Sequence, residues 1–262
     1  DIFEIFDTKN NVKGTDTPLE AAKRGKDTSM WLAIESGKNK EADAIISAGN
    51  TGALLVIAKL NLKMIENIDK PALSALWPNE KGMSVVLDLG ANIECSDKNL
   101  IDFAVMGSSV FKSLYPNEIA KVALLNIGSE EMKGNEVIKD TYQKLNRIKS
   151  SDYEFKGYIE GNNIMKGDVN VIVSDGFTGN IALKTAEGTA EFLTKNLKKA
   201  LSENILSKIS AIFSYFSLKR FKDRLDPRKY NGAIFLGLTG PVVKSHGGTD
   251  GLGFSYSVEL CY

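Results

Sequence analysis

Four apolar segments of strand length, each followed at once by a loop rich in glycine and asparagine, constrain this chain most. The segments are residues 42–47, 84–88, 122–126 and 168–173, and the loops span 48–52, 89–92, 127–131 and 174–180. Their hydrophobicity is continuous rather than alternating, which is typical of strands buried on both faces of a parallel sheet.

Helical patterns alternate with these segments. They run from the Thr17-Pro18-Leu19-Glu20 capping box toward Ser36, from Ser96 or Asp97, from Asn135, and from near Gly179 past Leu201. The alternation predicts an α/β fold with a mostly parallel sheet. Since no linker rich in Pro, Gly or Ser interrupts the chain, we expect a single domain over residues 1–262.

The same alternation predicts where the chemistry takes place. Right-handed crossovers should bring the strand ends to one edge of the sheet. Helix N-termini at that edge offer N–H groups and positive dipole ends to an anion. We therefore expect the four loops to converge on a phosphate-sized polar site, although Gly and Asn could also serve only to turn the chain.

Composition excludes several kinds of site. Thirty-three basic residues balance thirty-three acidic ones, so nucleic acid is not an expected partner, and an acidic partner would need a local basic patch. Two cysteines and one histidine are too few for a disulfide framework, a zinc site or a multi-histidine metal centre. Neither a Walker loop nor a G-x-G-x-x-G motif follows a strand, so no cofactor is predicted. Low cysteine usage, with no recognisable signal peptide or spanning segment, predicts a cytoplasmic location.

Two of the loops offer groups that could bind an anion. In residues 49–52 the glycines permit close backbone approach, and the side chains of Asn50 and Thr51 can bond a ligand oxygen. Lys133 lies between a strand and the following helix, where it can hold phosphate or stabilise a carbonyl oxyanion. The alternative for Lys133 is an ordinary exposed loop lysine.

Two further loops carry an amide and the single imidazole. Asn180 would lie at the first turn of the longest helix, where its amide could donate to an oxyanion or simply cap the helix. Lys184, one turn later, could face the same edge. His246 follows Lys244 and Ser245 and precedes two glycines. For this lone histidine, a structural role is the alternative to catalysis.

Several motifs, taken in order, resemble those of the bacterial phosphate acyltransferase family, also called acyl-acyl-carrier-protein:phosphate transacylase. They are residues 47–54 (SAGNTGAL), 88–92 (DLGAN), 125–128 (LNIG), 133–135 (KGN), 175–180 (DGFTGN) and 244–247 (KSHG). The similarity extends from about Pro18 to the C-terminus. Family members begin with a strand and an Asp/Gly-rich loop that lines the site. This chain shows no counterpart of that segment and stops within the family's C-terminal helix, so we expect an N-terminal segment to be missing.

The resemblance implies transfer of a fatty acyl group from acyl carrier protein to inorganic phosphate, which gives acyl phosphate for phospholipid biosynthesis. It also implies a homodimer and a three-layer α/β/α fold like that of the isocitrate and isopropylmalate dehydrogenases. The family's catalytic lysine and asparagine fall on Lys133 and Asn180. Candidate contacts to phosphate or substrate are Asn50, Thr51, Gly52, Asn92, Gly179, Lys184 and His246.

Residues 205–218 form an unusually apolar stretch, and residues 219–224 after it are mostly basic. We expect a projecting helical segment over residues 200–230 that packs on the dimer mate or contacts the inner face of the membrane, with a core helix as the alternative. Because acyl carrier protein is acidic, the basic clusters at residues 23–26 and 219–222 are candidates for its docking surface.

Two other functions stay open at this point. A phosphate acetyl- or butyryltransferase that uses coenzyme A would share the phosphate chemistry, and a basic nucleotide pocket would favour it over an apolar tunnel. The chain could also be a non-catalytic scaffold that recruits partners to the membrane through residues 205–224. Such a scaffold would still bind its partners after substitution of Lys133 or Asn180, whereas an enzyme would lose its activity.

Overall fold

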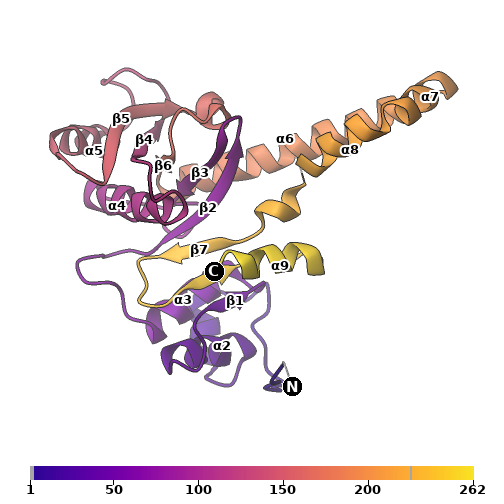
Figure 1. The fold of residues 1–262 in the computed structure, drawn as a ribbon. Helices are drawn as coiled ribbons and strands as arrows, with labels where there is room; N and C mark the ends of the chain where they lie inside the picture. The colour runs from indigo at the N-terminus through magenta and orange to yellow at the C-terminus, as the bar shows by residue number, and fades with distance from the viewer. Residues whose placement is uncertain (1–2, 225) are drawn as a thin grey trace.

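A computed structural model describes residues 3–224 and 226–262 (Figure 1). The helices are α1 (Pro18–Arg24), α2 (Ser29–Lys38), α3 (Thr51–Asn61), α4 (Asp97–Leu114), α5 (Glu136–Arg147), α6 (Gly176–Ser202), α7 (Ile205–Phe213), α8 (Tyr215–Arg224) and α9 (Gly251–Glu259), with 3-10 helices η1 (Gly161–Lys166) and η2 (Pro227–Tyr230). The strands are β1 (Ile45–Ser47), β2 (Ala72–Asn79), β3 (Gly82–Leu87), β4 (Ala120–Asn126), β5 (Tyr153–Glu160), β6 (Val171–Val173), β7 (Ala233–Leu236) and β8 (Val242–Lys244).

All strands of the described residues join one sheet in the order β1-β8-β7-β2-β3-β6-β4-β5. Strands β3, β6, β4 and β5 are mutually parallel, and β1 is parallel to β8. The three pairs β8–β7, β7–β2 and β2–β3 are antiparallel and join the two parallel parts. The predicted α/β fold with a mostly parallel sheet is therefore confirmed.

The prediction that all four strand ends point to one edge of the sheet is wrong for β1, whereas the convergence of its loop on the same site stays a prediction. Three antiparallel pairings separate β3 from β8, so β8 and its parallel neighbour β1 run opposite to β3, β6 and β4. The loops after β3, β4 and β6 thus share an edge, whereas the loop after β1 lies in the other half of the sheet. Figure 1 shows this half below the β3 half.

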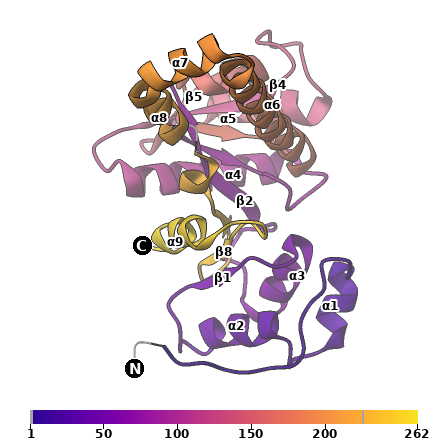
Figure 2. The same ribbon diagram turned by 90° about the vertical axis from the view of Figure 1, so that its right-hand side faces the viewer.

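Helices cover both faces of the sheet, because successive side chains of each strand point to opposite faces. On β3, Val85 and Leu87 pack with residues of α4 and α5, and Val86 packs in the cluster that includes α6. The cluster that contains Val86 continues into the β1 half of the sheet, where α2 and α3 cover β1 and β8. The three-layer arrangement agrees with the prediction, and Figure 2 shows it from the side.

Helix starts follow the predicted caps, with two differences. Ser96 caps α4 and Asn135 caps α5. The helix expected to continue toward Ser36 is instead two helices, because Gly25 adopts a φ of 140° after α1 and Thr28 then caps α2. The long helix α6 begins at Gly176, capped by the side chain of Asp175, so Asn180 lies in its second turn.

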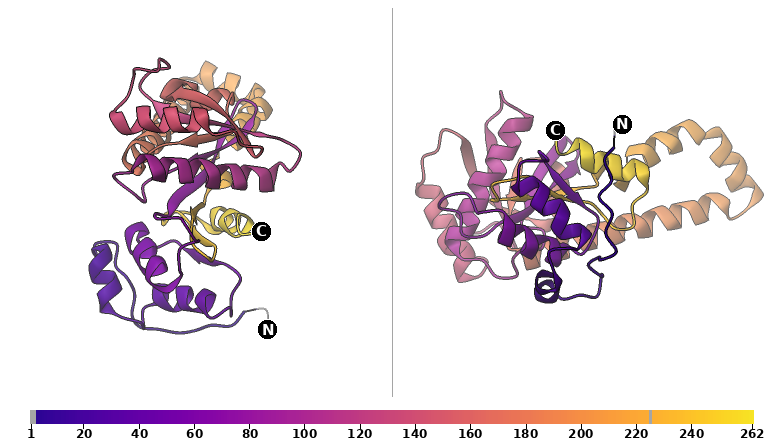
Figure 3. Two further views of the ribbon diagram at one scale, coloured as in Figure 1. Left: turned by 90° about the vertical axis from the view of Figure 1, so that its left-hand side faces the viewer. Right: turned by 90° about the horizontal axis from the view of Figure 1, so that it is seen from below.

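A helical arm projects from the body of the molecule, as predicted for residues 200–230. It consists of the second half of α6 with α7 and α8, and Figures 1 and 3 show it extending away from the sheet. Neither α7 nor α8 contains a buried residue among those described. Within the described chain, no helix is long and apolar enough to cross a membrane.

Candidate active site

The loop that follows β3 is organised around one buried carboxylate. Asp88 is 0% exposed. Its Oδ1 accepts the backbone N–H groups of Leu73 (3.0 Å), Gly90 (3.1 Å) and Ala91 (2.9 Å). Its Oδ2 accepts the backbone N–H of Asn92 (2.7 Å) and the Nδ2 amide of the same residue (2.8 Å). These five hydrogen bonds fold the chain into a tight turn at the end of β3.

The start of α6 packs directly on this turn. The backbone N–H of Gly176 donates to the carbonyl of Asn92 at 2.8 Å. A Cβ on Gly179 would lie 1.9 Å from the carbonyl oxygen of Asp88, and one on Gly176 would lie 2.5 Å from the carbonyl oxygen of Asn92. Only glycine therefore fits at these two positions, which explains the spacing of the DGFTGN motif.

The exposed side chain of Asn180 lies beside Gly90 of the same turn. Its amide has no hydrogen-bond partner within the described residues, and Asp175 rather than Asn180 caps α6. Both amide hydrogens of Asn92, in contrast, are used inside the protein, by Oδ2 of Asp88 and by the carbonyl of Pro71 (2.7 Å). In this structure Asn92 therefore supports the turn, and a contact from it to phosphate stays a prediction.

Lys133 lies on the loop between β4 and α5. The Nδ2 amide of Asn126 closes this loop by donating to the carbonyls of Gly128 and Lys133, each at 3.1 Å. The Lys133 side chain is exposed and forms no ion pair in the part of the chain that is described. Because β4 is the neighbour of β6, this loop shares its sheet edge with the start of α6.

The candidates after β1 serve local structure. Asn50 caps α3 by accepting the N–H of Ala53, and its own amide donates to the carbonyls of Gly14 and Asp16. Thr51 is the first residue of α3. A Cβ on Gly52 would lie 2.8 Å from Cγ of Pro18, so this glycine lets α1 pack closely on α3. Phosphate binding by residues 50–52 stays a prediction.

His246 lies on a loop beside the one after β1, since a Cβ on Gly247 would lie 3.1 Å from the carbonyl oxygen of Ala48. Nδ1 of His246 accepts the backbone N–H of Gly248 at 3.1 Å, and its own backbone N–H donates to Oδ1 of Asn231. The ring is exposed. Its predicted role in phosphate or substrate binding is not tested by these contacts.

Two lysines, Lys184 in one half of the molecule and Lys244 in the other, influence each other electrostatically. Lys184 of α6 is exposed and pairs with Glu187 at 2.7 Å. Lys244, at the end of β8, is half-buried, and its Nζ donates to the carbonyl of Ser245. No carboxylate pairs with it among the described residues. Burial, and then the nearby positive charge of Lys184, lower the pKa of Lys244 below its ordinary value.

The structure thus brings Asn92, Gly179 and Asn180 together, with the Lys133 loop at the same edge of the sheet. Sequence reasoning missed two residues of this region. Asp88 opens the DLGAN motif, and a buried strand that ends in Asp before a glycine was its available signal. Lys244 stands at the end of an apolar strand, two residues before His246, and a lysine at a strand end was its available signal.

An apolar groove of about 850 Å³ lies on another face of α6. It is lined by one row of that helix, which includes Ala182, Ala186 and Leu193, together with Trp77, Ile164 and Phe221. None of the nine predicted site residues lines it. Since helical residues three and four apart share a face, Asn180 and Lys184 belong to a different row of α6.

Comparison with known proteins identifies the family. Residues 1–261 match the family model described as fatty acid synthesis protein. A phosphate acyltransferase of Pelagibacter ubique (strain HTCC1062) is 74% identical over 259 residues, which are 99% of this chain and 78% of that protein. A phosphate acyltransferase of Maricaulis maris (strain MCS10) is 47% identical over 262 residues, 100% of this chain and 74% of that protein.

Two solved structures share the fold. A phosphotransacetylase from Streptococcus pyogenes covers 90% of this chain and 67% of its own, with a TM-score of 0.59 and 16% identity. A branched-chain phosphotransacylase from Enterococcus faecalis V583 covers 100% of this chain and 85% of its own, with a TM-score of 0.56 and 16% identity. The predicted likeness to the isocitrate and isopropylmalate dehydrogenases stays a prediction.

The fold is that of the phosphotransacylases, and with these relatives it defines an acyltransferase. The chain belongs to the phosphate acyltransferase family.

Proposed function

We propose that this protein transfers a fatty acyl group from acyl carrier protein to inorganic phosphate and so forms acyl phosphate for phospholipid biosynthesis. Its membership of the phosphate acyltransferase family supports acyl transfer to phosphate. The acyl carrier protein as donor follows from the family resemblance of the sequence motifs.

The observation that carries the phosphate site is the half-buried ammonium of Lys244 at the end of β8, which no carboxylate pairs with among the described residues. A half-buried ammonium without a carboxylate partner, close to a second positive charge, is electrostatically unfavourable. An anion bound beside Lys244 would offset its charge, while Lys184, which pairs with Glu187, adds a further positive group in the region. Phosphate has the charge and the number of acceptor oxygens that this arrangement requires.

The reaction needs no activated side-chain nucleophile, because phosphate is itself a nucleophile. A phosphate oxygen attacks the thioester carbonyl carbon, a C–O bond forms, and the carbonyl oxygen becomes an oxyanion. When the carbonyl re-forms, the C–S bond breaks and the carrier's thiolate leaves and takes up a proton from water. In this proposal the free amide of Asn180 donates to the oxyanion, and Lys133 stabilises its charge.

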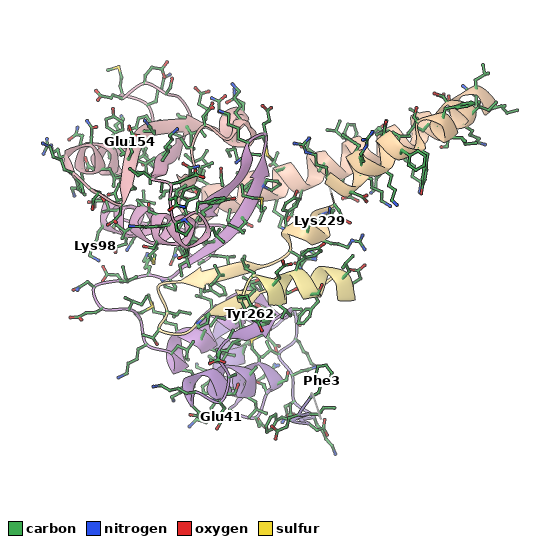
Figure 4. All side chains as sticks on the ribbon, viewed as in Figure 1. Phe3, Glu41, Lys98, Glu154, Lys229 and Tyr262 are labelled. Atoms are coloured by element: carbon green, nitrogen blue, oxygen red, sulfur yellow. The ribbon has the colours of Figure 1, made fainter. Side chains whose placement is uncertain are left out.

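The helical arm supports two further proposals about partners. Its α7 and α8 expose large apolar side chains, and Phe213 is 86% exposed. Figure 4 shows side chains of the arm extending away from the body of the molecule. We propose that these side chains contact a second copy of the chain in a homodimer and the surface of the membrane, with a cytoplasmic location on its inner face.

Basic residues 219, 220, 222 and 224 of α8 add electrostatic attraction to anionic lipid or to acidic acyl carrier protein. Residues 23–26, at the end of α1, are the second candidate surface for the carrier.

The experiment that tests the proposed function compares donors. The purified protein is given phosphate with either an acyl-acyl-carrier-protein thioester or the matching acyl-coenzyme A, and acyl phosphate is measured. The proposal predicts a higher kcat/KM with the carrier protein. A higher kcat/KM with coenzyme A would instead identify a coenzyme A-dependent phosphotransacylase, and no product with either donor would refute acyl transfer to phosphate.

A further inference from the structure

Asp88 is the most highly connected buried carboxylate near the site, and the proposed reaction does not use it directly. Four backbone N–H groups and one side-chain amide donate to its two oxygens. Burial raises the pKa of Asp88, while the hydrogen bonds from Ala91, Asn92 and Leu73 act in the opposite direction. All five of these groups are donors, so the arrangement fits the ionised carboxylate, which only accepts.

Hydrogen bonds and packing contacts link Asp88, at the end of β3, to Asn180, the candidate oxyanion donor. The carboxylate fixes Asn92, and the carbonyl of Asn92 receives the first N–H of α6, from Gly176. Four residues further along α6, Asn180 lies beside Gly90, whose N–H also donates to Asp88. The carboxylate of Asp88 therefore holds Gly90 directly, and it holds the start of the helix that carries Asn180 through Asn92.

We propose that Asp88 is a positioning residue for the acyl transfer reaction, which holds the turn after β3 against the start of α6 and so fixes the amide of Asn180 at the reacting carbonyl. The inference rests on the proposed function. A displacement of about 1 Å in such an arrangement can cost about 100-fold in rate without loss of the fold. Since Asp88 would act through Asn180, its effect should depend on whether Asn180 is present.

A double-mutant cycle tests this dependence. In Asp88→Asn, an NH2 group replaces one acceptor and faces N–H donors on either side, so the turn has to shift. We expect kcat to fall about 100-fold, with little change in the KM for phosphate. In the Asn180→Ala background, the same substitution should lower kcat by less than about threefold. A purely structural role would leave the two losses additive.

Two further variants keep the test decisive. Ser108→Ala removes a different buried hydrogen bond, from Oγ to the carbonyl of Ala104 in α4, and should lower the melting temperature but not kcat. Asn92→Ala, at a half-buried position, removes one donor to Asp88 and serves if Asp88→Asn does not fold. It should lower kcat about tenfold and be equally non-additive with Asn180→Ala.

Additive losses in both cycles would overturn the positioning role, as would a change in the KM for phosphate alone. A wild-type protein that forms no acyl phosphate would instead overturn the proposed function, and this is measured first.

Discussion

Asn180 lies against Gly90, such that a Cβ on Gly90 would be 3.6 Å from both Cβ and Cγ of the asparagine. Gly90 has a φ of 130°, which side-chain-bearing residues rarely adopt. The turn after β3 and the second turn of α6 therefore meet without a side chain between them. This leaves one face of the Asn180 amide beside an exposed backbone.

Substitution of Asn180 should separate an oxyanion donor from a structural residue. Asn180→Ala should lower kcat about 10²- to 10³-fold, since it removes one donor to the oxyanion. Asn180→Asp should lower kcat further, because a carboxylate would repel both phosphate and the developing charge. Steady-state kinetics of the two variants give the comparison, and Asn196→Asp, on the same helix, is the matched control. Equal activity of the two Asn180 variants would mean that this residue serves only the helix.

Lys133→Ala should lose about 10²- to 10³-fold in kcat and keep its melting temperature, since the exposed side chain provides charge rather than packing. Lys149→Ala removes an exposed loop lysine beyond the other end of α5 and should leave kcat unchanged. The assignment of Lys133 fails if its variant retains near-normal turnover.

Lys244→Gln should raise the KM for phosphate about 10- to 100-fold, as expected for loss of a hydrogen bond to a charged group. Lys59→Gln, which removes an exposed lysine of α3, is the control. The KM should also depend on pH, because only the charged form of Lys244 attracts phosphate. Its pKa is lowered, so that form is lost at a lower pH than for an ordinary lysine, and the KM should rise there.

The charge of Lys184 contributes to that lowering, so Lys184→Gln should move the rise in KM to higher pH. A pH profile of KM that is the same in wild type and Lys184→Gln would show that the two lysines do not share a phosphate.

Phe213→Glu combined with Phe216→Glu should stay folded and keep activity on soluble acyl carrier protein, because both side chains are exposed on the arm. The variant should lose cosedimentation with anionic vesicles, since apolar anchoring is lost and negative charge is added. Ser210→Glu with Ser217→Glu adds the same charge at polar positions of the arm and should bind vesicles better than the phenylalanine variant. Retained binding after the phenylalanine changes would exclude the membrane role, and loss of a dimer would assign these residues to the subunit interface.

Much of the fold was predictable from local signals. Continuous apolar runs indicated the buried parallel strands, and Ser96 and Asn135 cap the helices that the sequence placed after them. The direction of β1 relative to β3 was not predictable. It depends on the three antiparallel pairings β3–β2, β2–β7 and β7–β8, which lie between them in the sheet. Pairing is decided by contacts between residues far apart in the chain.

The candidate site was also predictable only in part, because some of its features follow from local motifs and others from contacts between distant residues. The glycines of DGFTGN indicated a close backbone approach, and the structure shows its target, the carbonyl of Asp88. The importance of Asp88 itself could not be read from one aspartate after a strand. Its role depends on Leu73, which lies fifteen residues away on a neighbouring strand.

The most direct test of the account is the stoichiometry of the reaction with acyl-acyl-carrier-protein thioester and phosphate. The account predicts that wild-type protein forms one acyl phosphate for each carrier thiol released, at a rate that depends on phosphate concentration. The Lys133→Ala and Asn180→Ala variants should form both products at least about 100-fold more slowly. Thiol release without acyl phosphate, or at a rate independent of phosphate, would contradict transfer of the acyl group to phosphate.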